Sequence, residues 1–173
     1  MGRLAEDLTI AASSQLLCNI GGSKWIPRTV RRLLFAAAGA HVRSSPGIEG
    51  TFVGRPSLLT IGHAVYINRE VFIEAVAPVS IGDGTAIGMQ AMILTSHHAI
   101  EAGGRWSDDV TPRPVTIGER VWIGARAVIL PGAVIEHGAI IAAGAVVSGR
   151  CEAFGVYAGV PARRVRDHSG ATR

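Results

Sequence analysis

A six-residue repeat of aliphatic residues runs from Ile61 to Val147 and constrains the fold more strongly than any other feature of the sequence. The fifth position of each hexad is mostly small or β-branched, as at Val65, Ala91 and Ala127. A fixed short period of this kind is typical of a repeat architecture. The repeat consists of eleven isoleucines and one valine: Ile61, Ile67, Ile73, Ile81, Ile87, Ile93, Ile117, Ile123, Ile129, Ile135, Ile141 and Val147.

The period of six fits neither an α-helix, which places apolar residues at i, i+3, i+4 and i+7, nor a lone amphipathic strand, which alternates them. It fits a chain that forms one short strand, turns a corner and repeats, so that three strands close a triangular coil of about eighteen residues. Each repeat residue would then point inward and stack on the residue one coil away, as Ile117 would on Ile135. Small polar residues at the corners, as in Gly82-Asp83-Gly84, supply turn conformations that larger residues resist. Burial of the isoleucine columns would drive folding.

Residues 1–40 are predicted to form a helical cap. A first helix is predicted over residues 4–18, with two acidic residues in its first turn. A second helix is predicted over residues 28–38 after Pro27. We expect the cap to cover the open first coil, and the alternative is that its basic face contacts a membrane surface or the acceptor substrate. The second helix has an apolar face (Val30, Leu33, Leu34 and Ala37) and arginines on or near the other face (Arg28, Arg31 and Arg32).

The solenoid is predicted over residues 41–154, beginning with an irregular lead-in that is rich in glycine and proline. The repeat stops after the second clear coil, and residues 99–116 form a glycine-, proline- and charge-rich loop that contains the isolated Trp106. A loop that leaves a rigid scaffold often carries functional groups. Residues 155–173 are expected to form a non-repeat C-terminal tail.

The composition narrows the class of protein and its partners. The net charge is +4, carried by sixteen arginines and the single Lys24, which suits an anionic ligand but is too modest and dispersed for nucleic-acid binding. Cys18 and Cys151 have neither the spacing of a disulfide framework nor that of a metal site. No long apolar run is present, and acidic residues near the N-terminus argue against a signal peptide, so we expect the cytoplasm.

Histidine is the first candidate for acid–base chemistry, because its unperturbed pKa lies near neutrality. His97 and His98 sit where the repeat breaks into the loop. In the repeat, His97 takes the small fifth position and His98 the outward sixth, where a substrate could reach it. The alternative is that the pair merely anchors the loop. The remaining histidines stand alone and are expected at the surface or at corners: His41, His63, His137 and His168.

Four segments carry a family resemblance that spans roughly residues 60–167: IGMQAMILTSHHAI, PVTIGERVWIGARAVILPGAVI, IIAAGAVVS and AGVPARRVR. They resemble the hexapeptide-repeat acyltransferases, closest to the galactoside, maltose and nodulation-factor O-acetyltransferases and to sugar acetyltransferases of polysaccharide synthesis. The resemblance implies an all-β fold, the left-handed parallel β-helix. It also implies acetyl-coenzyme A as the donor, no requirement for a metal, and a homotrimer with sites between neighbouring solenoids.

The resemblance also implies roles for individual residues. The family's general base is a histidine before the loop, which His98 matches when counted forward from Ile87 and backward from Pro114, with His97 as the alternate. Acceptor contacts are implied for Asn68 and Glu74. Coenzyme contacts are implied for an aromatic residue, small residues and two arginines that would engage phosphates: Trp122, Ala125, Ala143, Ser148, Gly149, Arg163 and Arg166. Ser148 and Gly149 replace a Thr-Lys pair of the family, so Arg150 would have to supply the missing cation.

These features favour an O-acetyltransferase that acts on a hydroxyl of a sugar or a glycosylated small molecule. An N-acetyltransferase of an amino sugar, an antibiotic or another secondary metabolite is the main alternative. A zinc lyase of the γ-carbonic-anhydrase type would need an H-x4-H pair, which the sequence lacks. A non-enzymatic solenoid would have no reason to combine the loop-edge histidine, VWIG and the arginine tail. The serine O-acetyltransferases carry a much longer helical N-terminal domain.

Overall fold

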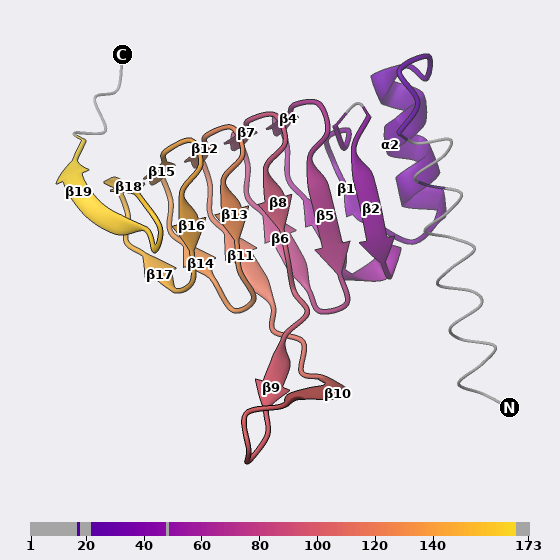
Figure 1. Ribbon diagram of the computed structural model, residues 1–173. Helices are drawn as coiled ribbons and strands as arrows, with labels where there is room; N and C mark the ends of the chain where they lie inside the picture. Colours follow the sequence, from indigo (N-terminus) through magenta and orange to yellow (C-terminus); the bar gives the residue numbers. More distant parts are fainter. Residues whose placement is uncertain (1–16, 18–21, 48, 169–173) are drawn as a thin grey trace, which may run out of the picture.

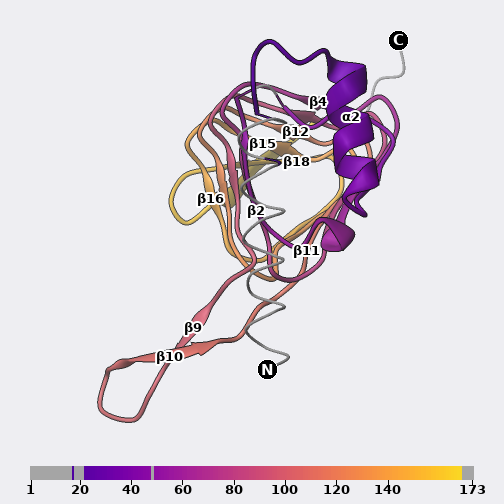
Figure 2. The same ribbon diagram turned by 90° about the vertical axis from the view of Figure 1, so that its right-hand side faces the viewer.

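The computed structural model describes residue 17, residues 22–47 and residues 49–168 (Figure 1). These residues form a parallel β-solenoid whose coils are three-sided when viewed from the end (Figure 2). The predicted fold class, an all-β left-handed parallel β-helix, is confirmed. The first predicted helix, over residues 4–18, falls almost wholly outside the described residues.

Each side of the solenoid is a sheet of very short strands, and successive coils supply successive strands. Sheet A contains β1 (His41–Val42), β3 (Leu59–Ile61), β6 (Val79–Ile81), β11 (Val115–Ile117), β14 (Val134–Ile135) and β17 (Arg150–Cys151). Sheet B contains β2 (Thr51–Gly54), β5 (Phe72–Ala75), β8 (Met92–Ile93), β13 (Val128–Ile129) and β16 (Val146–Val147). Sheet C contains β4 (Tyr66–Ile67), β7 (Ala86–Ile87), β12 (Trp122–Ile123), β15 (Ile140–Ile141), β18 (Gly155–Ala158) and β19 (Arg163–Asp167).

The six-residue repeat forms the core. All twelve repeat residues are buried, each with at most 4% of its surface exposed. Ile117 pairs with Ile81 on one side and with Ile135 on the other, which confirms the predicted stacking one coil apart. Most fifth-position residues are buried with them. Thr85 occupies this position without an unpaired hydroxyl, because Oγ1 donates to the Gly118 carbonyl at 2.8 Å and accepts from the Val121 amide at 3.1 Å.

Several corners hold residues other than glycine in the left-handed backbone conformation. Glu70, Gln90 and Arg126 occupy equivalent corners between sheets C and B, and each has a φ between 57° and 61°. This conformation costs an ordinary L-residue on the order of 1–2 kcal/mol. Their side chains form a ladder along the solenoid: Gln90 Nε2 donates to Glu70 Oε2 at 2.5 Å, and Arg126 Nε donates to Gln90 Oε1 at 2.8 Å. Contacts between coils therefore help to hold turns that a single coil would disfavour.

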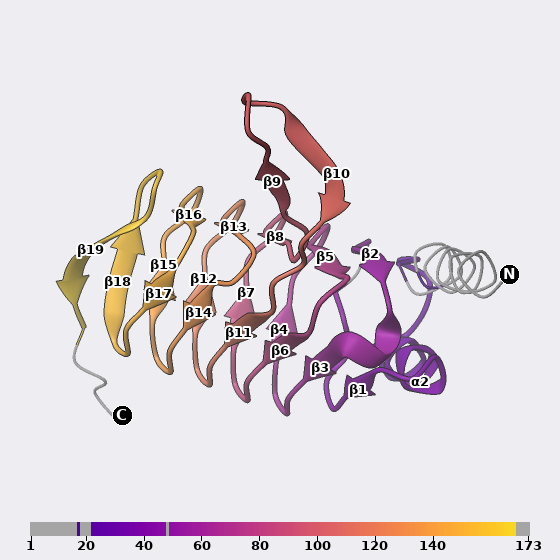
Figure 3. The same ribbon diagram turned by 90° about the horizontal axis from the view of Figure 1, so that it is seen from below.

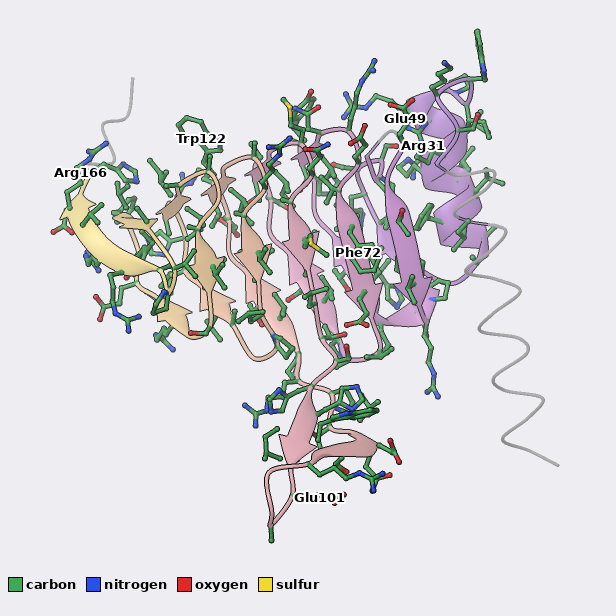
Figure 4. The ribbon with its side chains drawn as sticks, viewed as in Figure 1. Arg31, Glu49, Phe72, Glu101, Trp122 and Arg166 are labelled. Atoms are coloured by element: carbon green, nitrogen blue, oxygen red, sulfur yellow. The ribbon has the colours of Figure 1, made fainter. Side chains whose placement is uncertain are left out.

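Helix α2 (Arg28–Ala37) covers the first coil and confirms the helix predicted over residues 28–38. Phe35 packs edge-on against Phe52 at a centroid distance of 5.5 Å. The predicted faces were wrong in part, since Val30 and Leu33 are 44% and 52% exposed whereas Arg31 is buried. The Arg31 guanidinium donates to the Ser23 and Ile26 carbonyls at 2.8 and 3.0 Å, and Figure 4 labels Arg31 on α2. Because these carbonyls accept its hydrogen bonds, Arg31 can be buried although the apolar periodicity places it on or near the polar face of the helix.

The other end of the solenoid is closed by the segment predicted as the C-terminal tail. β18 pairs in parallel with β15 and so adds a strand to sheet C, after which β19 turns back antiparallel to β18. Arg164 of β19 pairs with Glu152, in the turn before β18, at 2.6 Å and with Asp167 of its own strand at 2.7 Å. Among the described residues, no helix combines the length and apolar composition that crossing a bilayer requires.

A hairpin of β9 (His98–Ile100) and β10 (Trp106–Val110) leaves the solenoid between β8 and β11. It coincides with the predicted loop of residues 99–116 and projects well away from the coils (Figure 3). It departs at the edge between sheets B and A, which is where the repeat is interrupted in the sequence.

Candidate active site

Glu74 on sheet B fixes the point at which the hairpin leaves the solenoid. Its Oε2 accepts from the Thr95 amide at 3.0 Å and from the Ser96 amide at 2.8 Å, and the Ser96 hydroxyl lies within 2.9 Å of both carboxylate oxygens. The buried Thr95 adds a second tie, since Oγ1 donates to the Glu74 carbonyl at 2.9 Å and accepts from the Val76 amide at 3.1 Å. The carboxylate that was predicted to contact the acceptor is thus engaged by the start of the hairpin.

His98, two residues beyond this clamp, is exposed and oriented by the opposite strand of the hairpin. Its Nδ1 lies 2.9 Å from the Ser107 carbonyl oxygen. A carbonyl oxygen only accepts hydrogen bonds, so the neutral imidazole carries its proton on Nδ1 and presents the lone pair of Nε2. The Trp106 ring packs edge-on against the imidazole at a centroid distance of 5.5 Å. A histidine held in this tautomer is suited to accept a proton at Nε2.

His97 has a different environment. Its backbone carbonyl accepts from the Thr111 amide at 2.7 Å and from the Thr111 hydroxyl at 3.1 Å, which closes the base of the hairpin. The side chain is exposed, and no hydrogen bond to it is found within the described part of the chain. The geometry therefore favours His98 over His97 as an oriented base.

Trp122 lies on β12 of sheet C, on the side of the solenoid away from the hairpin (Figure 2). The residue is 59% exposed, and its side chain points outward (Figure 4). It stands between Ala86 on the preceding coil and Ile140 on the following coil. The row of paired residues across sheet C continues from Ile140 to Val156 on β18 and then to Arg166 on β19. An aromatic ring that no neighbour covers provides a surface against which a ligand can pack.

The small residues predicted to line the coenzyme site lie at corners of the solenoid. Ala125 and Ala143 lie at equivalent corners between sheets C and B. The neighbouring coil approaches this corner closely, because a Cβ added to Gly88 would meet the Ala125 amide nitrogen at 2.6 Å. Ser148 and Gly149 are exposed at the edge between sheets B and A, which is also the edge from which the hairpin departs.

The arginines near the C-terminal end of the solenoid differ in whether a carboxylate already pairs with them. Arg163 and Arg166 are exposed on β19, where they pair with Ala158 and Val156 of β18, and neither forms an ion pair with a described residue. Arg150, the substitute for the family's lysine, instead pairs with Glu136. That carboxylate also accepts from the Ala153 amide at 2.9 Å, and the backbone hydrogen bond together with Arg150 lowers the pKa of Glu136.

Asn68 occupies the corner between sheets C and B on the first regular coil. Its Oδ1 accepts from the Arg69 amide at 2.8 Å, which leaves the side-chain amide nitrogen as a donor. Asn68 lines a hollow of ≈ 220 Å³ together with Tyr66 and Arg28.

The predicted site residues separate onto two edges of the solenoid within one chain. Asn68, Ala125 and Ala143 follow the edge between sheets C and B, with Trp122 beside it, whereas the hairpin and Ser148 follow the edge between sheets B and A. Sheet B lies between the two groups. A single chain therefore does not bring His98 and Trp122 together.

Sequence reasoning missed the residues that orient the base. Trp106 stood out only as an isolated aromatic, and nothing in the sequence indicated that it would pack on His98. Ser107 acts through its backbone carbonyl, which leaves no side-chain signal. Glu74 accepts hydrogen bonds from Thr95 and Ser96 only because these residues align with it across two coils, and the sequence did not indicate this contact. Among the described residues, no group of three or more histidine, cysteine or acidic residues could hold a metal ion.

Sequence comparison identifies part of the repeat. The family described as bacterial transferase hexapeptide (six repeats) matches residues 114–149. Nodulation protein L of Rhizobium leguminosarum bv. viciae is 45% identical over 65 residues, which cover 38% of this chain and 34% of that protein. Nodulation protein L of Rhizobium meliloti (strain 1021) is 43% identical over 65 residues, or 38% of this chain and 36% of that protein. The match thus spans about a third of the curated relatives' length.

Structural similarity extends over nearly the whole chain. A hexapeptide-repeat-containing acetyltransferase from Vibrio cholerae O1 biovar eltor, complexed with acetyl-coenzyme A, has a TM-score of 0.84 and 25% identity over 96% of this chain and 91% of that one. A galactoside acetyltransferase in complex with coenzyme A has a TM-score of 0.80 and 25% identity over 93% and 81%. A maltose O-acetyltransferase from Clostridium difficile 630, at 22% identity over 94% and 88%, shares the fold with a TM-score of 0.80. Residues 114–149 thus match the hexapeptide-repeat family, and the chain has the fold of these acetyltransferases.

Proposed function

We propose that the protein transfers an acetyl group from acetyl-coenzyme A to a hydroxyl of a sugar or a glycosylated small molecule. The observation that carries this proposal is the orientation of His98, whose Nδ1 lies 2.9 Å from the Ser107 carbonyl and whose Nε2 is thereby left basic. Similarity to acetyltransferases that were crystallised with acetyl-coenzyme A and coenzyme A supports the donor. Similarity to nodulation protein L supports the family assignment over part of the chain.

His98 would act as a general base in a direct transfer. Nε2 accepts the proton of the acceptor hydroxyl while the hydroxyl oxygen forms a bond to the thioester carbonyl carbon. As the carbon–sulfur bond breaks, the imidazolium returns the proton to the departing sulfur, so that the acetyl ester and the free thiol are released. A positioned base of this kind typically contributes about 10²–10⁴-fold to the rate. This route requires neither a covalent enzyme intermediate nor a metal.

The donor would be held by residues on sheet C and on the C-terminal strand. The exposed ring of Trp122 would pack against the pantetheine arm, with Ala125 and Ala143 leaving room beside it. Ser148 and Gly149, on the other edge of sheet B, would reach the same molecule from a second copy of the chain. Arg163 and Arg166 would bind its phosphates, and their freedom from ion pairs with described residues supports this role. Arg150 is a weaker candidate because Glu136 already pairs with it.

The acceptor would meet Asn68, whose side-chain amide nitrogen faces no described acceptor. We assign Glu74 a positioning role, because its carboxylate accepts hydrogen bonds from Thr95 and Ser96 at the start of the hairpin. In this arrangement Glu74 fixes the root of the strand that carries His98.

We further propose a homotrimer in the cytoplasm, with each site formed between two solenoids. The separation of His98 and Trp122 onto different edges of one chain supports a site that is completed by a second copy. Light scattering coupled to size exclusion tests the assembly, and a monomer that turns over substrate would contradict it.

Turnover of acetyl-coenzyme A against a panel of sugars, glycosides and amino sugars tests the function. Release of free thiol with an acceptor, but not without it, is the expected result. Alkaline hydroxylamine then separates the two chemistries, because it cleaves an acetyl ester and leaves an acetamide intact. An ester product supports the proposed O-acetylation. An amide product would favour the amino-sugar alternative, and no thiol release with any acceptor would contradict the proposal.

A further inference from the structure

A hollow of ≈ 240 Å³ lies on the surface between helix α2 and the first coil, and three arginines line it. Arg28 and Arg32 stand about one turn apart on α2, and Arg43 follows β1. Thr29 and Ser44 contribute to the lining, and none of the described carboxylates does. Pockets that enclose drug-sized ligands measure about 300–1,000 Å³, so this hollow suits a small charged group rather than a whole cofactor.

The positive charge in this hollow has no acidic counterpart in the described chain. Arg28, Arg32 and Arg43 form none of its ion pairs, which involve Arg69, Arg105, Arg150 and Arg164 instead. Arg28 lies over the Tyr66 ring at 5.4 Å, a contact that steadies the guanidinium and leaves its charge uncompensated.

The local backbone makes this concentration of charge more unfavourable. The first turn of α2 begins at Arg28 and contains no acidic residue, although a helix N-terminus disfavours cations. Arg28 and Arg32 are like charges four residues apart, a spacing that disfavours the helix. Burial and the charge of Arg28 both lower the pKa of the neighbouring Arg31. A bound anion would offset the unfavourable field at the helix N-terminus and the repulsion between Arg28 and Arg32.

We propose that this hollow binds a phosphate-type oxyanion. The guanidinium fork matches two oxygens of a phosphate group, and the N-terminus of α2 adds a positive field at the same place. The hollow lies at the first coil, whereas Arg163 and Arg166 lie on β19 at the opposite end of the solenoid (Figure 1), so this is a second anion site. A phosphorylated small molecule and a phospholipid headgroup offer the same chemistry to it.

Calorimetric titration of the full-length chain with inorganic pyrophosphate tests the proposal. The wild type is expected to bind it saturably, and an Arg32→Gln/Arg43→Gln variant about tenfold or more weakly. Arg120→Gln, an exposed arginine at a corner of a central coil, is the matched control and should bind like the wild type. An Arg163→Gln/Arg166→Gln variant should retain this binding, which separates the hollow from the proposed coenzyme site.

Melting temperatures guard against a folding artefact. Without an anion, Arg32→Gln/Arg43→Gln should melt at or above the wild-type temperature, because repulsion between the arginines is relieved. Pyrophosphate should raise the melting temperature of the wild type but not that of the double variant. Co-sedimentation with phosphatidylcholine vesicles, with and without phosphatidic acid, shows whether the bound phosphate group belongs to a lipid or to a free compound. Arginine-dependent capture by phosphatidic acid indicates a lipid headgroup, and pyrophosphate binding without capture indicates a free phosphate compound. Equal pyrophosphate binding by the wild type and Arg32→Gln/Arg43→Gln would overturn the proposal.

Discussion

Nδ1 of His98 lies 2.9 Å from the carbonyl oxygen of Ser107, across the two strands of the projecting hairpin. This contact fixes the neutral tautomer, and Trp106 packs against the imidazole at a centroid distance of 5.5 Å. The hairpin therefore does more than extend from the solenoid, because its second strand orients the side chain that its first strand carries. The root of the hairpin is in turn fixed by Glu74.

Replacement of Glu74 by glutamine is expected to loosen the hairpin. Glutamine keeps one acceptor oxygen but removes the negative charge, so the hydrogen bonds from the Thr95 and Ser96 amides lose their charge assistance, at a cost of about 1–2 kcal/mol in the free energy of unfolding. Hydrogen exchange should become faster over residues 97–112 while the amides of the solenoid core stay protected. Glu101→Gln, which changes an exposed carboxylate at the turn of the same hairpin (Figure 4), should leave exchange unchanged. Equal exchange in wild type and Glu74→Gln would refute the clamp.

Alanine at Gly88 is expected to destabilise the stack. The added Cβ would meet the Ala125 nitrogen at 2.6 Å and the Gly124 carbonyl carbon at 2.9 Å, and both are backbone atoms that can yield only if the coils separate. Overpacking of this kind costs about 1–3 kcal/mol. Gly149→Ala is the matched control, because its Cβ would enter open space. Denaturant unfolding of the two variants measures the difference, and similar midpoints would count against the close approach at this corner.

Glu136 is expected to make stability depend on acidic pH. Its hydrogen bond from the Ala153 amide and its pairing with Arg150 lower the pKa of the folded carboxyl below its ordinary value of 4.5. Such a group stabilises the fold above its unfolded pKa, and the contribution is lost as pH falls through the folded pKa. Glu136→Gln should therefore melt below the wild type at neutral pH, with the gap closing below about pH 4. Glu119→Gln, exposed and outside these ion pairs, should show no gap at either pH.

Cys151 is expected to be unreactive in the folded protein. Burial raises the pKa of its thiol to about 11, so the reactive thiolate is scarce at pH 8. Titration with a disulfide reagent in a Cys18→Ser background isolates this thiol. It should react only after unfolding in denaturant, and rapid reaction of the native protein would contradict its burial.

The solenoid was predictable because its repeat is simple and strict. A single inward position recurs in every hexad, so the core, the stacking of Ile117 on Ile135 and the point of interruption follow from spacing alone. The face of α2 was not predictable in the same way. Arg31 is buried because two backbone carbonyls receive it, and sequence periodicity does not report where carbonyls point.

The corners and the site were only partly predictable. Glycine, Asp and Asn were expected at the turns, yet Glu70, Gln90 and Arg126 adopt positive φ values and form a ladder between coils. The break in the repeat identified His98 as a candidate, whereas its tautomer depends on a backbone carbonyl nine residues later that carries no sequence signal. The separation of the site residues onto two edges follows from counting strands around the coil, which requires the observed register.

The most direct test of the proposed chemistry compares acetyl transfer by wild type, His98→Ala and His97→Ala at saturating acetyl-coenzyme A. Loss of the oriented base should lower kcat by about 10²–10⁴-fold in His98→Ala. His97→Ala should retain most of the activity, and both variants should bind coenzyme A as the wild type does. Wild-type turnover by His98→Ala, or loss of turnover in His97→Ala alone, would contradict the assignment of His98 as the base.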